Sequence, residues 1–262
     1  MINAPETYTT WLMVATDIAY EAGALLKTHW RSGDAVHSKG YRNIVTAADL
    51  AAEELILTRL RAAFPNHTIT SEEAGADIED TPARWYVDPL DGTTNFAHNN
   101  PNFCVSIAAT REGIPVVGVI YDPLRDFLFA ATRNGGATLN NAPIHCSGIT
   151  ALSEATFAAD WPRDPQPRLE LWARASRLMV EARTLRVLGA AALNMAYVAA
   201  GWFDLYLART LSPWDMAAGV LIAQEAGAVA STLNGAPWTL EHSDLVLAAT
   251  PALLQTWLQL ED

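Results

Sequence analysis

Two aspartates, Asp88 and Asp91, stand three residues apart in the segment WYVDPLDGTTNF, which covers residues 85–96. An apolar run that favours a strand precedes them, and the strand should end at about Asp88, because Pro89 cannot extend a central strand. Carboxylate oxygens are the ligands that hard cations such as Mg²⁺ prefer. The end of this strand is therefore a candidate metal site.

Gly92, Thr93 and Thr94 come directly after the second aspartate. Glycine permits a backbone conformation closed to other residues, and a threonine side chain can cap a following helix. The free N–H groups at a helix start favour an anion. The segment thus offers carboxylates for a cation beside donors for an anion, and phosphate chemistry needs that pairing.

Two other interpretations of this segment remain open on these residues alone. Aspartate is common where a strand ends before a glycine turn, so an Asp-x-x-Asp-Gly string is as compatible with a plain turn as with a site. The haloacid-dehalogenase phosphatases also carry paired aspartates after a strand, one of them a nucleophile. Their aspartates sit two residues apart, so the three-residue spacing of Asp88 and Asp91 disfavours that class.

Three further acidic positions could complete a site, although each has a structural interpretation. Glu72 follows a strand-like segment, where acids often form a solvated edge. Asp49 stands three residues after Thr46, and Asp215 three residues after Ser212, so each can close a capping box. Several carboxylates in one small volume would raise each other's pKa values unless cations compensated them. The combination, more than any single residue, favours a metal site.

The first half of the chain should position most of these residues with two long helices and a sheet. Apolar residues recur at helical spacing in the helices, and glycine and proline separate the last three strands, which indicates an antiparallel meander. The expected elements are helices at 11–30 and 47–64, and strands at 68–71, 84–88, 103–110, 116–121 and 126–132.

The second half alternates shorter strands and helices, which favours an α/β layer arrangement. The Pro-rich stretch WPRDPQPR, residues 161–168, should form a loop that overhangs the pocket. The expected elements are strands at 155–159, 184–187, 203–207 and 245–249, and helices at 169–180, 190–200 and 213–226.

The overall composition excludes several classes of protein. The chain has 262 residues, half of them hydrophobic, which suits a compact globular protein. A net charge of -12 argues against a nucleic-acid or anionic-membrane partner. The two cysteines, Cys104 and Cys146, have no metal-type spacing and suit a reducing cytoplasm. We expect no export signal, no membrane span and a cytoplasmic location.

Five motifs occur in the order typical of one family, and together they extend over nearly the whole chain. They are VTAAD at 45–49, SEEAG at 71–75, DPLDGTTNF at 88–96, GAAALNMAYVAAG at 189–201 and PWDMAAG at 213–219. The chain resembles the inositol monophosphatase family of magnesium-dependent, lithium-sensitive phosphatases. The DPLDGTTNF string is the most specific of the motifs.

The resemblance implies an architecture as well as a chemistry. It implies an α+β or α/β fold, layered as an αβαβα sandwich of the sugar-phosphatase type, and a homodimer. An N-terminal α+β domain at 1–146 would carry most metal ligands. A C-terminal α/β domain at 147–262 would carry Asp215 and the substrate-side residues.

Carried over residue by residue, the resemblance also implies a set of metal ligands. Glu72, Asp88 and the backbone carbonyl of Leu90 would bind one Mg²⁺, and Asp88, Asp91 and Asp215 a second. The set contains only oxygen donors, which suits magnesium better than zinc.

Three more residues acquire roles near these metals from the same resemblance. Asp49, close to Glu72, would position water around a third, weaker ion, and Thr93 would orient the attacking water. The expected catalytic residues are thus Glu72, Asp49, Thr93 and Asp91. Lys39 matches a basic residue that the family places near the site.

Substrate contacts are expected from the turn after the metal ligands and from the second half of the chain. N–H groups of the turn would hold phosphate oxygens, as helix starts commonly do. The expected substrate-binding residues are Gly92, Thr93, Thr94, Asp160, Arg186, Gly189, Ala190 and Arg209.

One position departs from the pattern of family members that act on inositol phosphates. Those members carry an acidic residue seven positions before the aspartate of the Trp-Asp motif, and here Ala208 stands at that position before Asp215. The sequence therefore predicts the phosphate chemistry better than the substrate.

The leading interpretation is a magnesium-dependent phosphomonoesterase that hydrolyses a small soluble phosphate ester with metal-activated water, using two or three ions. Histidinol phosphate, fructose 1,6-bisphosphate and a nucleotide 3'-phosphate are alternative substrates. A regulatory binding protein on the same fold is a further alternative, as some bacterial relatives engage transcription machinery.

Overall fold

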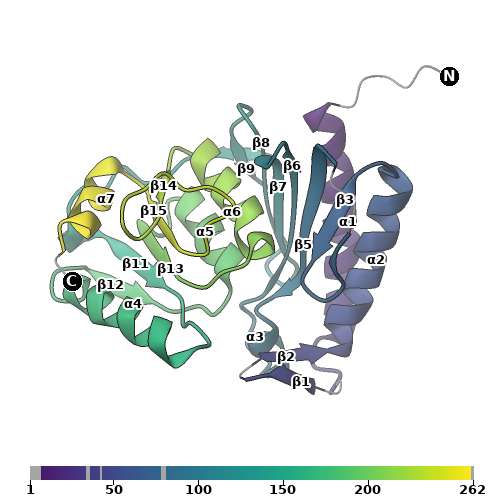
Figure 1. Cartoon of the computed structure of the whole chain (residues 1–262), viewed down its shortest axis with the longest axis horizontal. Coiled ribbons are helices and arrows are strands. Elements are labelled where there is room, and N and C mark those ends of the chain that lie inside the picture. The colour runs from purple at the N-terminus through teal and green to yellow at the C-terminus, as the bar shows by residue number, and fades with distance from the viewer. Residues whose placement is uncertain (1–6, 34–35, 42, 78–80, 261–262) are drawn as a thin grey trace.

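In the computed structural model, which describes residues 7–33, 36–41, 43–77 and 81–260, layers of helix, sheet, helix, sheet and helix follow one another across the long axis of the molecule (Figure 1). The expected αβαβα sandwich is therefore confirmed. Helices α1 (Tyr8–His29) and α2 (Ala47–Ala63) form one outer layer. Helices α4 (Pro165–Leu178) and α7 (Pro251–Leu258) lie at the other end.

The first sheet has eight strands in the order β10-β9-β8-β7-β6-β5-β3-β4 within the described residues. Strands β3 and β5 run parallel, and their neighbours pair antiparallel, so the expected meander is confirmed. The bounds are β3 Thr68–Ser71, β4 Gly75–Ala76, β5 Ala83–Asp91, β6 Cys104–Arg111, β7 Ile114–Asp122, β8 Phe127–Thr132, β9 Ala137–Leu139 and β10 Ala142–Ile144.

The second sheet has five strands in the order β12-β11-β13-β15-β14 among the residues described. Strand β11 pairs in parallel with β12 and β13, whereas β15 pairs antiparallel with β13 and β14. The bounds are β11 Thr156–Ala159, β12 Thr184–Arg186, β13 Leu205–Ala208, β14 Val229–Ser231 and β15 Leu245–Ala248.

Helices α5 (Ala191–Ala199) and α6 (Pro213–Glu225) lie between the two sheets (Figure 1). Every residue of α5 is buried, and the helix is apolar on all sides, as a helix with a sheet on either face must be. Three shorter elements complete the chain: the hairpin β1 (Val36–Gly40) and β2 (Asn43–Thr46), helix α3 (Thr93–Ala97) and a 3₁₀ turn at Leu152–Glu154. Helix α6, which belongs to the second predicted domain, packs on β6 and β7 of the first. The division into two domains at residues 146 and 147 therefore stays a prediction.

Three local predictions were wrong, each for a physical reason. Strand β5 continues past Asp88 to Asp91, because its pairing with β6 becomes irregular between these residues and so accommodates Pro89. Helix α4 begins at Pro165 rather than Leu169, because proline suits the first turn of a helix. Neither Thr93 nor Thr94 caps α3: the cap is Gly92, in the left-handed conformation.

Candidate active site

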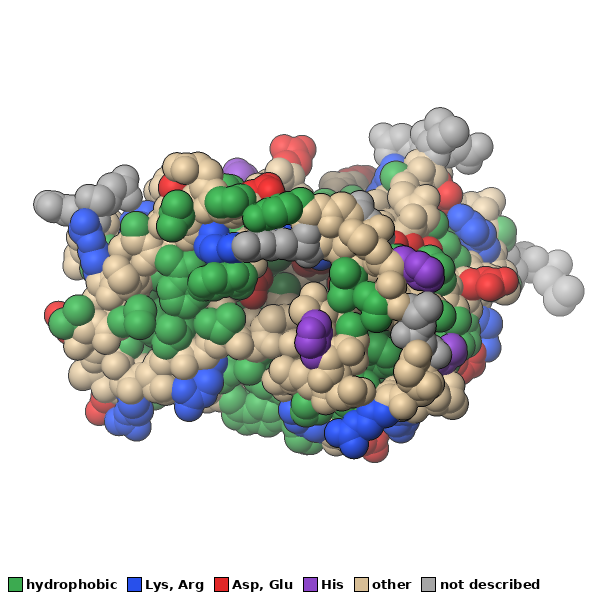
Figure 2. All heavy atoms as spheres, turned by 90° about the horizontal axis from the view of Figure 1, so that it is seen from below, with side chains coloured by type: hydrophobic (Ala, Val, Ile, Leu, Met, Phe, Trp, Pro, Cys, Tyr) green, Lys and Arg blue, Asp and Glu red, His purple; other side chains and the backbone are tan. Residues whose placement is uncertain are grey.

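A cavity of about 550 Å³ lies between the end of β5, the start of α6 and the loop that follows β11. Carboxylates from four segments line it: the residues after β3, the end of β5, the loop after β11 and the start of α6, together with the turn between β5 and α3. The face that carries α3 and the β1–β2 hairpin is hollowed near its middle, and acidic side chains are visible inside the hollow (Figure 2). The pocket brings together Glu72, Asp88, Leu90, Asp91, Gly92, Thr93, Thr94, Asp160, Gly189, Arg209 and Asp215 of the expected site residues.

The irregular end of β5 places both aspartates of the motif in the pocket. Asp88 is buried, and its Oδ1 accepts a hydrogen bond from the N–H of Leu90 at 3.0 Å. Asp91 is also buried and faces the start of α5, where its Oδ1 and Oδ2 accept hydrogen bonds from the N–H groups of Ala191 and Ala192 at 3.0 and 2.7 Å. These two N–H groups lack intrahelical acceptors, so the carboxylate satisfies them.

Gly92 makes the sharp turn that follows. Its φ of 92° belongs to the left-handed region, and a Cβ there would lie 2.7 Å from the carbonyl oxygen of Asn102. Gly92, Thr93 and Thr94 all line the pocket, at the start of α3.

Thr93 connects this turn to the first turn of α2. Its hydroxyl donates to Oδ1 of Asp49 at 3.0 Å and lies 3.1 Å from the carbonyl oxygen of Leu90. The other oxygen of Asp49 accepts from the N–H of Thr46 at 2.8 Å, which closes the expected capping box. Asp49 itself lies behind the pocket, and Thr93 is the residue that reaches it.

Glu72 and Asp215 line the pocket from two further segments of the chain. Glu72 follows β3, and Asp215 lies in the first turn of α6, where its Oδ2 accepts from the N–H of Ser212 at 2.7 Å and closes the second expected capping box. Nη2 of Arg163 approaches Oε1 of Glu72 to 4.0 Å. The two capping boxes therefore hold Asp49 and Asp215 in place, the two aspartates that the sequence analysis placed at helix starts.

Burial and mutual repulsion act on these carboxylates in the same direction. Burial raises the pKa of Asp88 well above its usual range, and the charges of Glu72, Asp91 and Asp215 raise it further. Burial also raises the pKa of Asp91 to about 7, against the opposing effect of the N–H groups of Ala192 and Ala191. The pKa of Asp215 is raised well above its usual range by burial and by Glu72 and Asp91, while Arg163 opposes that shift.

The donor set suits a hard cation, although the side chains are not arranged around one. Among the residues that the structure describes, no three Asp, Glu, His or Cys side chains form a group that could hold a metal ion as it stands. The carboxylates are nevertheless close enough to raise each other's pKa, and every available donor is oxygen.

Four expected site residues lie outside the pocket or outside the described atoms. Asp49 is set behind Thr93, and Ala190 is buried without lining the cavity. Arg186 is exposed, and its Nη1 donates to Oγ1 of Thr184 at 2.5 Å and to the carbonyl oxygen of Leu185 at 2.9 Å. Lys39 lies in β1, and its side chain falls outside the part of the chain that the structure describes.

The loop after β11 and the start of α4 contribute residues that the sequence did not single out. Arg163 and Arg168 line the pocket beside Asp160 and Trp161. Asp160 is buried, and its two oxygens accept from the hydroxyl of Tyr206 at 2.5 Å and from the amide of Asn194 at 3.3 Å. The sequence did offer one signal for these arginines, because both stand in the stretch that was expected to overhang the pocket.

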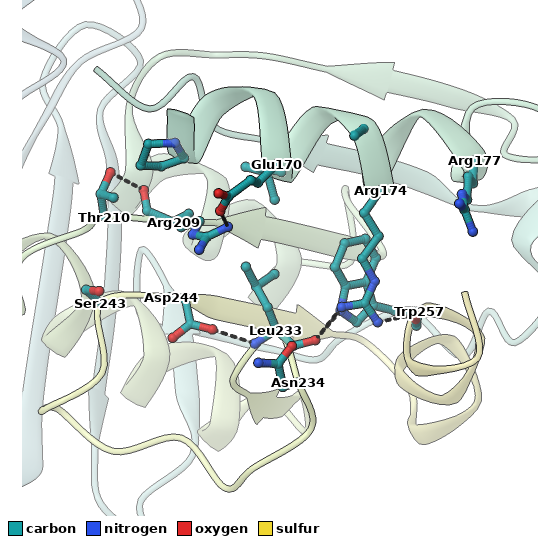
Figure 3. Close-up of a pocket in the computed structure, with 13 residues that line it drawn as sticks. Glu170, Arg174, Arg177, Arg209, Thr210, Leu233, Asn234, Ser243, Asp244 and Trp257 are labelled. Carbon is teal, nitrogen blue, oxygen red and sulfur yellow. Dashed lines mark hydrogen bonds and ion pairs between the residues drawn. The ribbon is translucent and has the colours of Figure 1, made fainter. Parts of the chain in front are cut away.

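A second, larger cavity of about 760 Å³ lies between α4, α7 and the loop after β14. Arg209 and Thr210 line both cavities. Figure 3 shows Arg209 directed at Glu170 of α4, with which it forms an ion pair. The side chain of Arg209 is therefore engaged on the side away from the carboxylates.

The layered fold and the acidic pocket define a class of protein for which solved structures exist. The extragenic suppressor protein suhB from Bartonella henselae has a TM-score of 0.90 and 34% sequence identity to this chain, covering 94% of this chain and 96% of that one. The profile of the inositol monophosphatase family matches residues 7–260. The chain belongs to the inositol monophosphatase family.

Two relatives show how similar the chain is to characterised members. The inositol-1-monophosphatase of Synechocystis is 37% identical over 272 residues, which cover 98% of this chain and 95% of the relative. The Nus factor SuhB of Escherichia coli K12 is 40% identical over 229 residues, which cover 86% and 85% of the two chains. Family membership supports a phosphatase, and thus a hydrolase that acts on a small phosphorylated substrate. In the described part of the chain, no helix has the length and apolar character needed to cross a membrane.

Proposed function

We propose that this protein is a magnesium-dependent phosphomonoesterase that hydrolyses a small phosphorylated metabolite with water as the nucleophile. One observation carries the proposal: the pKa of the Asp88 carboxyl is raised by burial and, in addition, by three other carboxylates, those of Glu72, Asp91 and Asp215. Such a cluster is costly without a compensating cation, because like charges in a buried site repel.

Most of the proposed ligands are oxygens of residues that line this pocket. Glu72, Asp88 and the carbonyl of Leu90 would hold one Mg²⁺, Asp88, Asp91 and Asp215 a second, and Asp49 would position water around a third. When bound, the ions would lower the pKa of water and neutralise charge on phosphate oxygens.

Thr93 is the residue whose contacts favour a role in orienting the nucleophile. Its hydroxyl can donate to Oδ1 of Asp49 or to the carbonyl oxygen of Leu90, and in either case the lone pairs of Oγ1 can accept a hydrogen bond from a water in the pocket. The capping box holds Asp49 in place and thereby fixes the hydroxyl. The N–H groups of Gly92, Thr93 and Thr94 would bind the phosphate oxygens that do not take part in bond cleavage.

The position expected to discriminate between substrates does not line the pocket. Ala208 is fully buried in β13, where it pairs with Leu245, whereas the residues after it, from Arg209 to Ser212, line the cavity. Inositol phosphate would therefore lack a carboxylate partner at this position. Histidinol phosphate, fructose 1,6-bisphosphate and nucleotide 3'-phosphates remain candidate substrates. Asp160, Gly189 and Arg209 are proposed substrate contacts, while Arg186, Ala190 and Lys39 are proposed on the family resemblance alone.

The decisive experiment is phosphate release with magnesium over a panel of inositol phosphate, histidinol phosphate, fructose 1,6-bisphosphate and 3'-phosphoadenosine 5'-phosphate, with and without lithium. We expect turnover that requires magnesium and falls with lithium. Asp88→Asn serves as the inactive reference. Turnover that a chelator leaves unchanged would refute the proposed metal dependence.

The family resemblance also suggests that the protein is a homodimer and cytoplasmic. Light scattering with the purified chain tests whether it is a dimer.

A second candidate function rests on the name of the Escherichia coli relative, Nus factor SuhB. If the chain released phosphate from no substrate and instead copurified with RNA polymerase, a regulatory role on the same fold would replace the enzymatic one.

A further inference from the structure

One wall of the pocket is basic and aromatic, whereas the acidic wall, formed by Glu72, Asp88, Asp91 and Asp215, comes from other segments of the chain. The basic wall consists of the loop after β11, the start of α4 and the turn after β13. Three arginines contribute to it, Arg163, Arg168 and Arg209, together with two acids, Asp160 and Asp164. The exposed ring of Trp161 lies beside them. A leaving group attached to phosphate on the acidic wall would face this surface.

Two of the three arginines are engaged by the protein itself. Nε and Nη2 of Arg168 donate to the carbonyl oxygen of Pro162 at 2.8 and 2.5 Å, and its guanidinium lies 4.8 Å from the centre of the Trp161 ring. Arg168 therefore shapes the loop. Arg209 forms its ion pair with Glu170, which lines the second cavity (Figure 3).

Arg163 differs from both. Within the described residues it donates no hydrogen bond. Its one ion-pair contact is the approach of Nη2 to Glu72 at 4.0 Å, with 58% of the arginine side chain exposed, and its charge also acts on Asp215. A contact at the limit of ion-pair distance from an exposed guanidinium contributes little. The guanidinium thus presents its donors to the pocket, and a planar guanidinium matches the geometry of phosphate and carboxylate groups.

The acids of this wall do not take the place of a hydroxyl-binding carboxylate. Both oxygens of Asp160 are occupied by Tyr206 and Asn194, and Asp164 is exposed at the first residue before α4. Ala208 supplies no carboxylate at all. The wall is better suited to an anionic leaving group than to a polyhydroxylated neutral one.

We propose that Arg163 is a specificity residue that binds a second anionic group, a phosphate or a carboxylate, on the leaving group of the substrate. This inference rests on the proposed phosphatase function. The phosphate that is cleaved would lie at the turn of Gly92 to Thr94, and Arg163 would bind the second group. The preferred substrates are then phosphate monoesters that carry another negative charge.

Matched pairs of substrates that differ by one phosphate test this assignment. The pairs are 3'-phosphoadenosine 5'-phosphate against adenosine 3'-phosphate, and fructose 1,6-bisphosphate against fructose 1-phosphate. For the wild type we expect kcat/KM to favour the bisphosphate of at least one pair by about 10-fold or more, the range of a hydrogen bond to a charged group. Arg163→Gln should abolish that preference through KM, with kcat/KM on the monophosphate within about threefold of wild type.

Two further variants separate recognition from structure. Arg163→Lys keeps the charge and should retain part of the preference. Arg177→Gln removes an exposed arginine of α4 that lines only the second cavity, and it should leave the preference unchanged.

Each outcome bears on one claim. Equal losses on both members of a pair, or an unchanged preference in Arg163→Gln, would overturn the role of Arg163 while leaving a phosphatase. A wild type that turns over monophosphates and prefers no bisphosphate would overturn it too. Failure of the wild type to release phosphate from any of the four compounds with magnesium would instead refute the proposed function itself.

Discussion

The carboxylate of Asp91, at the end of β5, accepts a hydrogen bond from the N–H of Ala192, at the start of α5, at 2.7 Å. One hundred and one residues separate the two, so the contact joins the first sheet to the helices between the sheets. Because the same carboxylate lines the pocket, the packing of the layers and the shape of the site depend on one side chain.

Asp91→Asn is expected to lower kcat at saturating magnesium by at least about 100-fold, since even residues outside a metal's ligand shell change activity by about 10- to 100-fold. The asparagine can accept from only one of the two N–H groups, those of Ala191 and Ala192. Steady-state kinetics over a magnesium titration checks the prediction, and circular dichroism confirms that the variant is folded. Near-normal turnover at saturating magnesium would exclude the second-metal role of Asp91.

Thr93→Ala removes the hydroxyl that donates to Asp49. We expect kcat to fall by about 100-fold, the lower range for loss of a group that orients a proton transfer, with KM little changed. Thr93→Ser keeps the hydroxyl and provides the matched control. Equal kinetics for the serine and alanine variants would show that the hydroxyl has no part in the reaction.

The helices and the meander could be predicted from the sequence because their periodicity is strong. Trp11 and Trp85 are fully buried in a helix and a strand that the pattern predicted. The short elements could not be predicted, among them β1, β9, β14 and α7, because a few residues carry no measurable period. Pro89 misled the prediction of β5, since an irregular strand pairing tolerates proline and no local pattern announces it.

The residues that gather in the pocket divide in the same way. Asp88, Asp91 and Asp215 stand in motifs with a local geometry, a strand end or a capping box, and the sequence could single them out. No local motif of this kind surrounds Arg163. Its position depends on how the loop after β11 crosses the end of β5, and only the packed structure shows it.

Magnesium is expected to stabilise the fold, because it would relieve the repulsion that raises the pKa of Asp88. At about 100 times the dissociation constant, a ligand adds about 2.7 kcal/mol, which corresponds to a rise in Tm of roughly 5 to 10 °C for a chain of this size. Differential scanning fluorimetry at constant ionic strength measures the rise. Asp88→Asn should lose most of it and should be the more stable protein without metal. The same rise in both proteins would place magnesium elsewhere.

Asp160 should make stability depend on pH. Burial raises its pKa to about 6, against the opposing hydrogen bonds from Tyr206 and Asn194, so the folded state binds the proton more tightly than the unfolded state. The stability associated with this proton is complete below about pH 4 and is lost as the pH rises to about 6.

Asp160→Asn carries no such proton, so its stability relative to wild type should improve between pH 4 and 6 and then stay constant. The shift of about two pKa units corresponds to a change on the order of 2 to 3 kcal/mol. Urea unfolding of both proteins over this pH range, with a chelator present, measures the difference. Parallel stability profiles would show that the carboxyl of Asp160 titrates normally.

Gly118 of β7 allows α6 to approach the first sheet, and α6 carries Asp215. A Cβ at Gly118 would lie 2.9 Å from the carbonyl oxygen of Ala218, a backbone atom that cannot move without its helix. Gly118→Ala should therefore lower the free energy of unfolding by about 1 to 3 kcal/mol, as overpacking does, and weaken magnesium binding by displacing α6.

Gly148→Ala is the control for this last variant, because a Cβ there meets nothing within 4 Å. We expect its stability to stay within about 0.5 kcal/mol of wild type. Urea unfolding and calorimetric titration with magnesium compare the two variants. If Gly118→Ala were as stable as Gly148→Ala but bound magnesium weakly, the helix would shift at no cost in packing. If both properties were unchanged, the close contact between β7 and α6 would have no bearing on the site.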